Sequence, residues 1–229
     1  MSKRINTIFS NVSRHYDTMN HVMSLGIDRT WRHAAAKEAA YKKGSLFILD
    51  VATGTGDLAF DIAKISGSRG IDARITGTDF NKRMLAIARQ KAKRSDTESV
   101  MFEYGDALRM KYKGGSFDVV VSGFALRNFD DLQRFAAEAR RVLKKGGRLV
   151  LLDMAQGDSP FVKAFFSVYS RIMLLMGSFV HKGAYSWLVR SIKDFDKNGL
   201  SNTLKYAGFR KIRTSDLFPG IAFIVVAVK

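Results

Sequence analysis

The sequence predicts an α/β fold in which a doubly wound, mostly parallel sheet of seven strands ends in an antiparallel hairpin. Two observations lead to this prediction. Short apolar runs alternate with segments of helical periodicity until about residue 155, which is typical of parallel strands joined by crossover helices. Two further apolar runs at the C-terminal end are joined at Pro219-Gly220, a turn signal that indicates a hairpin.

Each strand is expected where a short apolar run is bounded by turn residues. The first run ends at a glycine-bearing turn, and the fourth, FDVVVS, is rich in β-branched residues, which predicts burial on both faces. The expected strands cover residues 46–51, 74–78, 100–104, 117–122, 148–154, 211–217 and 221–228.

Helices are expected where apolar residues recur every three or four positions. Asn81 is a suitable N-cap for one of them, and Gly146-Gly147 is expected to end another. The expected helices cover residues 5–40, 58–65, 81–93, 131–143, 160–177 and 198–206.

Composition excludes several kinds of protein. The chain has 229 residues and no cysteine, so it has neither a disulfide framework, a thiolate metal site nor a cysteine nucleophile. The N-terminal region lacks the apolar block of a secretory signal, and Arg171 interrupts the most apolar stretch, 164–180. We therefore expect a cytoplasmic protein. Its net charge of +17 either attracts the chain to anionic surfaces or only reflects an unusually charged soluble surface.

Acidic side chains follow three successive strands. Asp50 precedes the glycine loop of Gly54 and Gly56, Asp79 ends the second strand, and Asp106 follows the third. The glycines alone also fit a dinucleotide site, but Asp50 would repel a pyrophosphate and suits an ammonium or sulfonium group. Three carboxylates at one sheet edge therefore favour the cationic nucleoside S-adenosylmethionine.

Other interpretations of these residues stay open. Asp50 could instead cap a helix, and Asp106 could be a turn residue rather than an acceptor for an adenine amino group. Phe80 either faces an adenine ring or packs in the core.

Several motifs along nearly the whole chain resemble the C-methyltransferases of ubiquinone and menaquinone biosynthesis. They are YDTMN (16–20) with MSLGIDR (23–29), LDVATGTGDL (49–58), FALRNFDD (124–131), the widespread RRVLKKGGRLVLLD (140–153), and the Ser191-Ile192 and Gly208-Phe209 pairs. The loop after Asp153 and the apolar last strand depart from the family pattern. Both departures bear on which quinone is the substrate.

The resemblance implies the class I methyltransferase fold, with S-adenosylmethionine as cofactor and no metal. It carries cofactor contacts to Thr55, Asp79, Asp106 and Ala107, and it places Gly123 where the family has a serine. It also implies one methyltransferase domain over 1–229, made of a helical cap (1–43), a cofactor-binding core (44–155) and substrate-side helices with the hairpin (156–229).

Methylation of a ring carbon needs a group that stabilises a phenolate and a group that takes the hydroxyl proton. Arg127 is suited to hold the phenolate, although it could also be a surface arginine paired with Asp130 or Asp131. Asn128 either orients the ring oxygen or caps the next helix. Tyr16 and the neighbouring His15 lie in the N-terminal segment, which is expected to cover the site and exclude water.

The expected partner is a prenylated quinol, reached through contact with an anionic membrane surface. The charge also allows an RNA substrate, but no basic and aromatic patch supports it. A cofactor-binding protein without catalysis is a third possibility, and the oligomeric state, including a homodimer, stays open.

Overall fold

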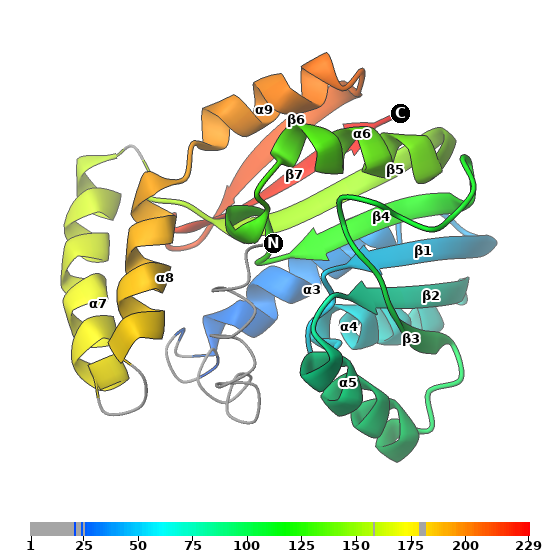
Figure 1. The fold of residues 1–229 in the computed structure, drawn as a ribbon, viewed down its shortest axis with the longest axis horizontal. Coiled ribbons are helices and arrows are strands. Elements are labelled where there is room, and N and C mark those ends of the chain that lie inside the picture. Colours follow the sequence, from blue (N-terminus) through cyan, green and yellow to red (C-terminus); the bar gives the residue numbers. More distant parts are fainter. Residues whose placement is uncertain (1–20, 22–23, 25, 158, 179–181) are drawn as a thin grey trace.

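The computed structural model describes residues 21, 24, 26–157, 159–178 and 182–229, which contain a seven-stranded sheet in the order β3-β2-β1-β4-β5-β7-β6 (Figure 1). The first five strands run parallel, and β7 is antiparallel to both of its neighbours. The predicted fold class is confirmed. The strands are β1 (Ser45–Val51), β2 (Asp72–Asp79), β3 (Val100–Tyr104), β4 (Phe117–Gly123), β5 (Leu143–Met154), β6 (Arg210–Leu217) and β7 (Ala222–Val228).

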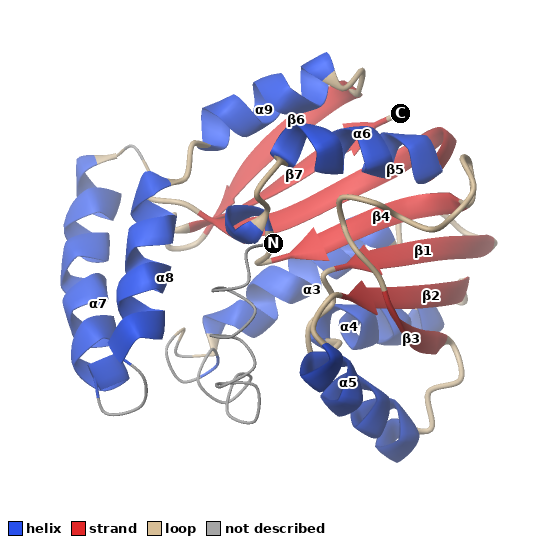
Figure 2. Ribbon diagram, viewed as in Figure 1, coloured by secondary structure: helices blue, strands red, loops and turns tan. Residues whose placement is uncertain are grey.

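Helices cover both faces of this sheet (Figure 2). One buried cluster joins α3, α4 and α5 to side chains such as Ile48 of β1, and the other joins α6 and α9 to the next residue, Leu49. Successive strand residues therefore point into opposite cores. The described helices are α3 (Ile27–Ala39), α4 (Asp57–Ser68), α5 (Lys82–Ser95), η1 (Leu126–Asn128), α6 (Leu132–Val142), α7 (Pro160–Ser178), α8 (Lys182–Asp194) and α9 (Lys197–Tyr206).

Local sequence explains most of these boundaries. Asn81 caps α5 by accepting hydrogen bonds from the backbone N–H groups of Arg83 and Met84, as predicted. Asp131 caps α6 in the same way through Arg134. The β-branched run of β4 is buried on both faces, because the strand lies between β1 and β5 in the centre of the sheet.

Two predicted boundaries are wrong, and one helix was not predicted. The strand expected from residue 148 begins at Leu143, so Gly146-Gly147 lies inside β5 rather than at a helix end. The continuous helix over 5–40 is interrupted at Gly26, whose φ of +79° is left-handed, and α3 starts after it. Helix α8 was not expected, and residues 5–20 of the predicted N-terminal helix lie outside the described residues.

The carboxyl ends of the parallel strands meet at one edge of the sheet, hereafter the carboxyl edge. Helices α7 and α8 form a hairpin beyond this edge, at the left of Figure 1. The N-terminal end of α3 lies on the same side of the sheet (Figure 1). Trp31 Nε1 of this helix donates a 2.7 Å hydrogen bond to the carbonyl of Phe218, in the turn between β6 and β7. None of the helices described is long and apolar enough to span a membrane.

Candidate functional site

The glycine loop between β1 and α4 is shaped for close approach by a ligand. Gly54 adopts a φ of +58°, and a Cβ placed on it would meet no atom within 4 Å. Gly56 has a φ of +88°, and its Cβ would lie 2.6 Å from Cζ of Phe102. The second glycine therefore packs against the core, whereas the first faces open space that a cofactor can occupy.

Asp79 links the end of β2 to this loop. Its Oδ2 accepts a 2.8 Å hydrogen bond from Gly54 N–H, and its Oδ1 accepts a 2.6 Å bond from Asn81 N–H. Burial raises the pKa of the carboxyl, while these two backbone bonds and a third from Phe80 N–H oppose the rise. The carboxylate is held rigidly beside the open side of Gly54 and retains lone pairs for ribose hydroxyls.

Asp50 is buried, although it lies near the end of β1. It is only 1% exposed, and its Oδ2 accepts a 2.6 Å hydrogen bond from Thr53 Oγ1. Burial and the neighbouring charge of Asp79 raise its pKa to about 7.

The other carboxyl oxygen of Asp50, Oδ1, indicates whether this site suits a cation. Asp50 Oδ1 is buried and has no hydrogen-bond partner among the described residues. An unsatisfied buried acceptor is costly, and a bound ammonium group would relieve the cost. The donors and acceptors around Gly54 therefore fit a cationic nucleoside.

The remaining predicted cofactor residues surround the loop at different depths. Thr55 is buried, whereas Gly123 and Ala107 are partly exposed. A Cβ on Gly123 would lie 3.1 Å from Leu58 Cδ2, so this strand end is tightly packed.

Two further predicted contacts lie at the ends of β2 and β3. Asp106 is exposed, and its Oδ1 accepts from Leu108 N–H, so it does act as a turn residue and keeps Oδ2 for another donor. Phe80 is 38% exposed, which contradicts core packing, and its ring centre lies 5.7 Å from that of Tyr104.

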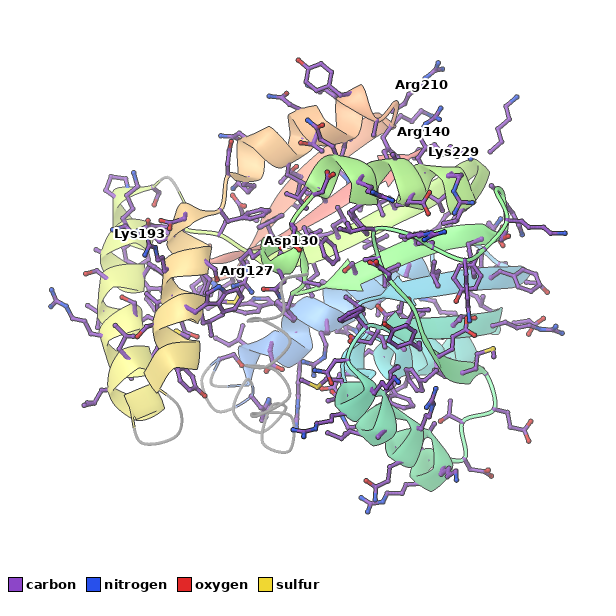
Figure 3. The ribbon with its side chains drawn as sticks, in the orientation of Figure 1. Arg127, Asp130, Arg140, Lys193, Arg210 and Lys229 are labelled. Carbon is purple, nitrogen blue, oxygen red and sulfur yellow. The ribbon has the colours of Figure 1, made fainter. Side chains whose placement is uncertain are left out.

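The side chain of Arg127 is buried and does not lie on the surface. Its Nε donates a 2.6 Å hydrogen bond to Asp153 at the end of β5, and its Nη1 donates a 2.9 Å bond to Ser191 Oγ of α8. Figure 3 shows it between η1 and α8. The alternative of a surface pair with Asp130 or Asp131 is therefore wrong, because the Arg127 side chain is 4% exposed and pairs with the fully buried Asp153.

Asn128 does not cap the next helix, since Asp131 does. Its side chain is 6% exposed, and its Oδ1 has no hydrogen-bond partner among the residues described. Asn128 is thus a second buried acceptor on the carboxyl edge. Tyr16 and His15 lie outside the described residues.

Sequence reasoning did not assign a role to Asp153 or Ser191. Asp153 also accepts from the backbone N–H groups of Leu126 and Met154, so it fixes the η1 turn. The signal was present, because Asp153 ends its strand just as Asp50 and Asp79 end theirs. Ser191 was noted only as part of the Ser191-Ile192 pair in the family resemblance, and its role was missed because the helix that carries it was not predicted.

An apolar wall adjoins these polar groups. One packed cluster joins α3, the residue after β4, the end of β5 and α7. It contains Trp31, Phe124, Met154, Phe166 and Tyr169. Within the described part of the chain, no group of three histidine or acidic side chains could hold a metal ion.

Comparison with known proteins gives the family. The model of the ubiE/COQ5 methyltransferase family matches residues 1–229. The chain belongs to this family. It is 40% identical over 210 residues to a demethylmenaquinone methyltransferase of Deinococcus radiodurans, covering 90% of this chain and 85% of the relative. It is 39% identical over 222 residues to the Chlorobaculum parvum protein of the same name, covering 94% and 87%.

Solved structures agree with this family at the level of the fold. A putative S-adenosyl-L-methionine-dependent methyltransferase from Methanococcus maripaludis has a TM-score of 0.68 at 17% identity, covering 98% of this chain and 93% of that one. Phosphoethanolamine N-methyltransferase 2 of Haemonchus contortus, in complex with S-adenosyl-L-methionine, has a TM-score of 0.63 at 16% identity, covering 86% and 52%. The ubiE/COQ5 family member described here is thus a methyltransferase with the Rossmann-like fold of such enzymes.

Proposed function

We propose that this enzyme transfers a methyl group from S-adenosylmethionine to a ring carbon of a prenylated quinol in respiratory quinone biosynthesis. The relatives named demethylmenaquinone methyltransferase favour demethylmenaquinol over a ubiquinol precursor. Two observations carry the proposal: Asp79 accepts a hydrogen bond from Gly54 at the open side of the glycine loop, and the buried Oδ1 of Asp50 has no partner among the described residues.

The glycine loop and its neighbours would hold the cofactor. Asp79 would accept the ribose hydroxyls, and Asp50 Oδ1 would accept from the ammonium group of the methionine moiety. Phe80 and Asp106 would contact the adenine, with backbone positions supplied by the residues Gly54, Thr55, Gly56, Ala107 and Gly123. Bound S-adenosylmethionine supplies a methyl group already activated by the positive sulfur.

Arg127 would stabilise the negative charge on the quinol oxygen once water has taken the hydroxyl proton. Methyl transfer to the ring carbon would release S-adenosylhomocysteine, and the hydrogen on that carbon would leave as a proton to water. Asp153 and Ser191 hold two of its N–H donors and leave others for the phenolate. The guanidinium is too basic to accept the proton, so its role is to fix charge and orientation. Asn128 Oδ1 is placed on the same turn to accept a hydrogen bond from a ring hydroxyl.

The three parts of the chain would share this work. The segment 1–43, with Tyr16, would cover the site, residues 44–155 would hold the cofactor, and residues 156–229 would contact the quinol. A prenylated substrate resides in lipid, so we place the enzyme in the cytoplasm at an anionic membrane surface, which its charge of +17 favours.

A labelled-methyl assay tests this function. The purified chain is incubated with methyl-labelled S-adenosylmethionine and reduced membrane lipid extract, and the product is analysed by mass spectrometry. We expect the label on the quinone ring, one methyl heavier than the substrate. Label in added RNA, or no label in any lipid, would refute the proposal.

A further inference from the structure

Helix α7 has two faces of different character. Its inward side chains, Phe166 and Met173, are each 3% exposed and pack into the protein. Large apolar side chains on the opposite face remain exposed, at spacings of four, three, four and three residues. This outer stripe consists of Phe161 (76% exposed), Phe165 (37%), Val168 (59%), Ile172 (51%) and Leu175 (66%).

Such a stripe is not ordinary surface. Single exposed apolar residues are common, but a contiguous row along one helix marks an interaction surface. The stripe follows helical periodicity over most of the 19 residues of α7, so it presents one continuous apolar strip. Figure 1 shows α7 at the outer margin of the molecule, with α8 beside it on the inner side.

The charge of the hairpin identifies the occupant. Residues 160–194, which span α7 and α8, contain five Lys or Arg and one acidic residue, Asp194, which pairs with Arg190. Arg171 is exposed and lies next to the stripe, three residues after Val168 and four before Leu175. An apolar strip on a hairpin with an excess of positive charge is complementary to a bilayer with anionic headgroups.

A second copy of the chain fits less well. Two stripes facing each other would bring Arg171 of both copies together, without any acidic residue on α7 to pair them. A lipid surface has no such conflict, because it supplies the missing negative charge.

We propose that the outer stripe of α7 lies in the interfacial region of an anionic membrane, with Arg171 against the headgroups. This inference rests on the proposed function and deepens it. The hairpin stands beyond the carboxyl edge, so docking through α7 brings the Arg127 end of the sheet to the membrane that holds the substrate.

Vesicle co-sedimentation of the full chain tests the surface. We expect binding to vesicles of phosphatidylglycerol and phosphatidylcholine, and none to phosphatidylcholine alone. Val168→Glu/Ile172→Glu should weaken binding about a hundredfold, since each side chain of this size contributes on the order of tenfold. Arg171→Glu should weaken it about thirtyfold, because it changes the charge beside the stripe by two units. The control is Tyr206→Glu on α9, where the tyrosine is 88% exposed, and it should bind normally.

The outcomes separate this surface from the proposed activity. Equal vesicle binding by every variant, or a lipid-free dimer that Val168→Glu/Ile172→Glu dissociates, would overturn the membrane surface. Methyl transfer to a short-chain, water-soluble quinol should be the same for wild type and Val168→Glu/Ile172→Glu. Absence of that transfer in the wild type would refute the function, whereas normal transfer without vesicle binding would refute the surface alone.

Discussion

Replacing Asp50 by Asn should change how stability depends on pH. Burial beside Asp79 raises the pKa of Asp50 from 3.8 to about 7, so the folded protein holds this proton more tightly than the unfolded chain. The stability that protonation provides is complete below the unfolded pKa and is lost as pH rises through the folded value. A difference of about three units corresponds to about 4 kcal/mol, of which about 3 kcal/mol is lost between pH 5 and 8.

Urea denaturation at pH 5 and pH 8 measures this effect. The wild type should lose about 3 kcal/mol more unfolding free energy between these pH values than Asp50→Asn. Asp79 is present in both proteins, and its own raised pKa adds the same direction of change to each. The matched control is Asp118→Asn, because ion pairs with Lys42 and Lys144 lower the pKa of Asp118 and its effect lies at lower pH. Identical pH dependence of wild type and Asp50→Asn would show that Asp50 stays ionised in the folded protein.

Other predictions concern the cofactor loop and the quinol side. Asp79→Ala should weaken S-adenosylmethionine binding about a hundredfold or more in calorimetry, and unchanged affinity would remove its role. Arg127→Ala should spare cofactor affinity but lower turnover about a hundredfold, and normal turnover in the labelled-methyl assay would contradict its contact with the phenolate. Gly56→Ala should destabilise the fold by about 3 kcal/mol in urea, because its Cβ would overlap Phe102. Gly54→Ala should cost only about 1 kcal/mol, since only backbone strain opposes it, and equal losses would contradict the packing difference.

Regular local patterns made most of the fold predictable. Strand β3 was predicted with its observed bounds, and the Asn81 cap was found because a side-chain oxygen there satisfies free N–H groups. Helix α8 was missed because its stability depends on packing against α7, through buried Tyr185 among others, rather than on a local signal. The early start of β5 was missed because Gly146-Gly147 is typical of a helix end, whereas here Gly146 N–H bonds to the carbonyl of Lys229.

The candidate site was predictable where it follows strand ends. Asp50, Asp79 and Asp106 do close or follow three neighbouring strands, as the sequence indicated. The burial of Asp50 and Asp79 could not be predicted, because it depends on how α4 and the glycine loop fold over β1. The partners of Arg127 were also beyond the sequence, since Asp153 and Ser191 come from elements 26 and 64 residues away.

Isothermal titration calorimetry of the wild-type chain tests the central claim most directly. We predict saturable binding of S-adenosylmethionine at one site per chain, with affinity that rises from pH 5 to 8 as a bound cation favours ionised Asp50. Absence of binding by both the methyl donor and its demethylated product, S-adenosylhomocysteine, would contradict the proposed cofactor site.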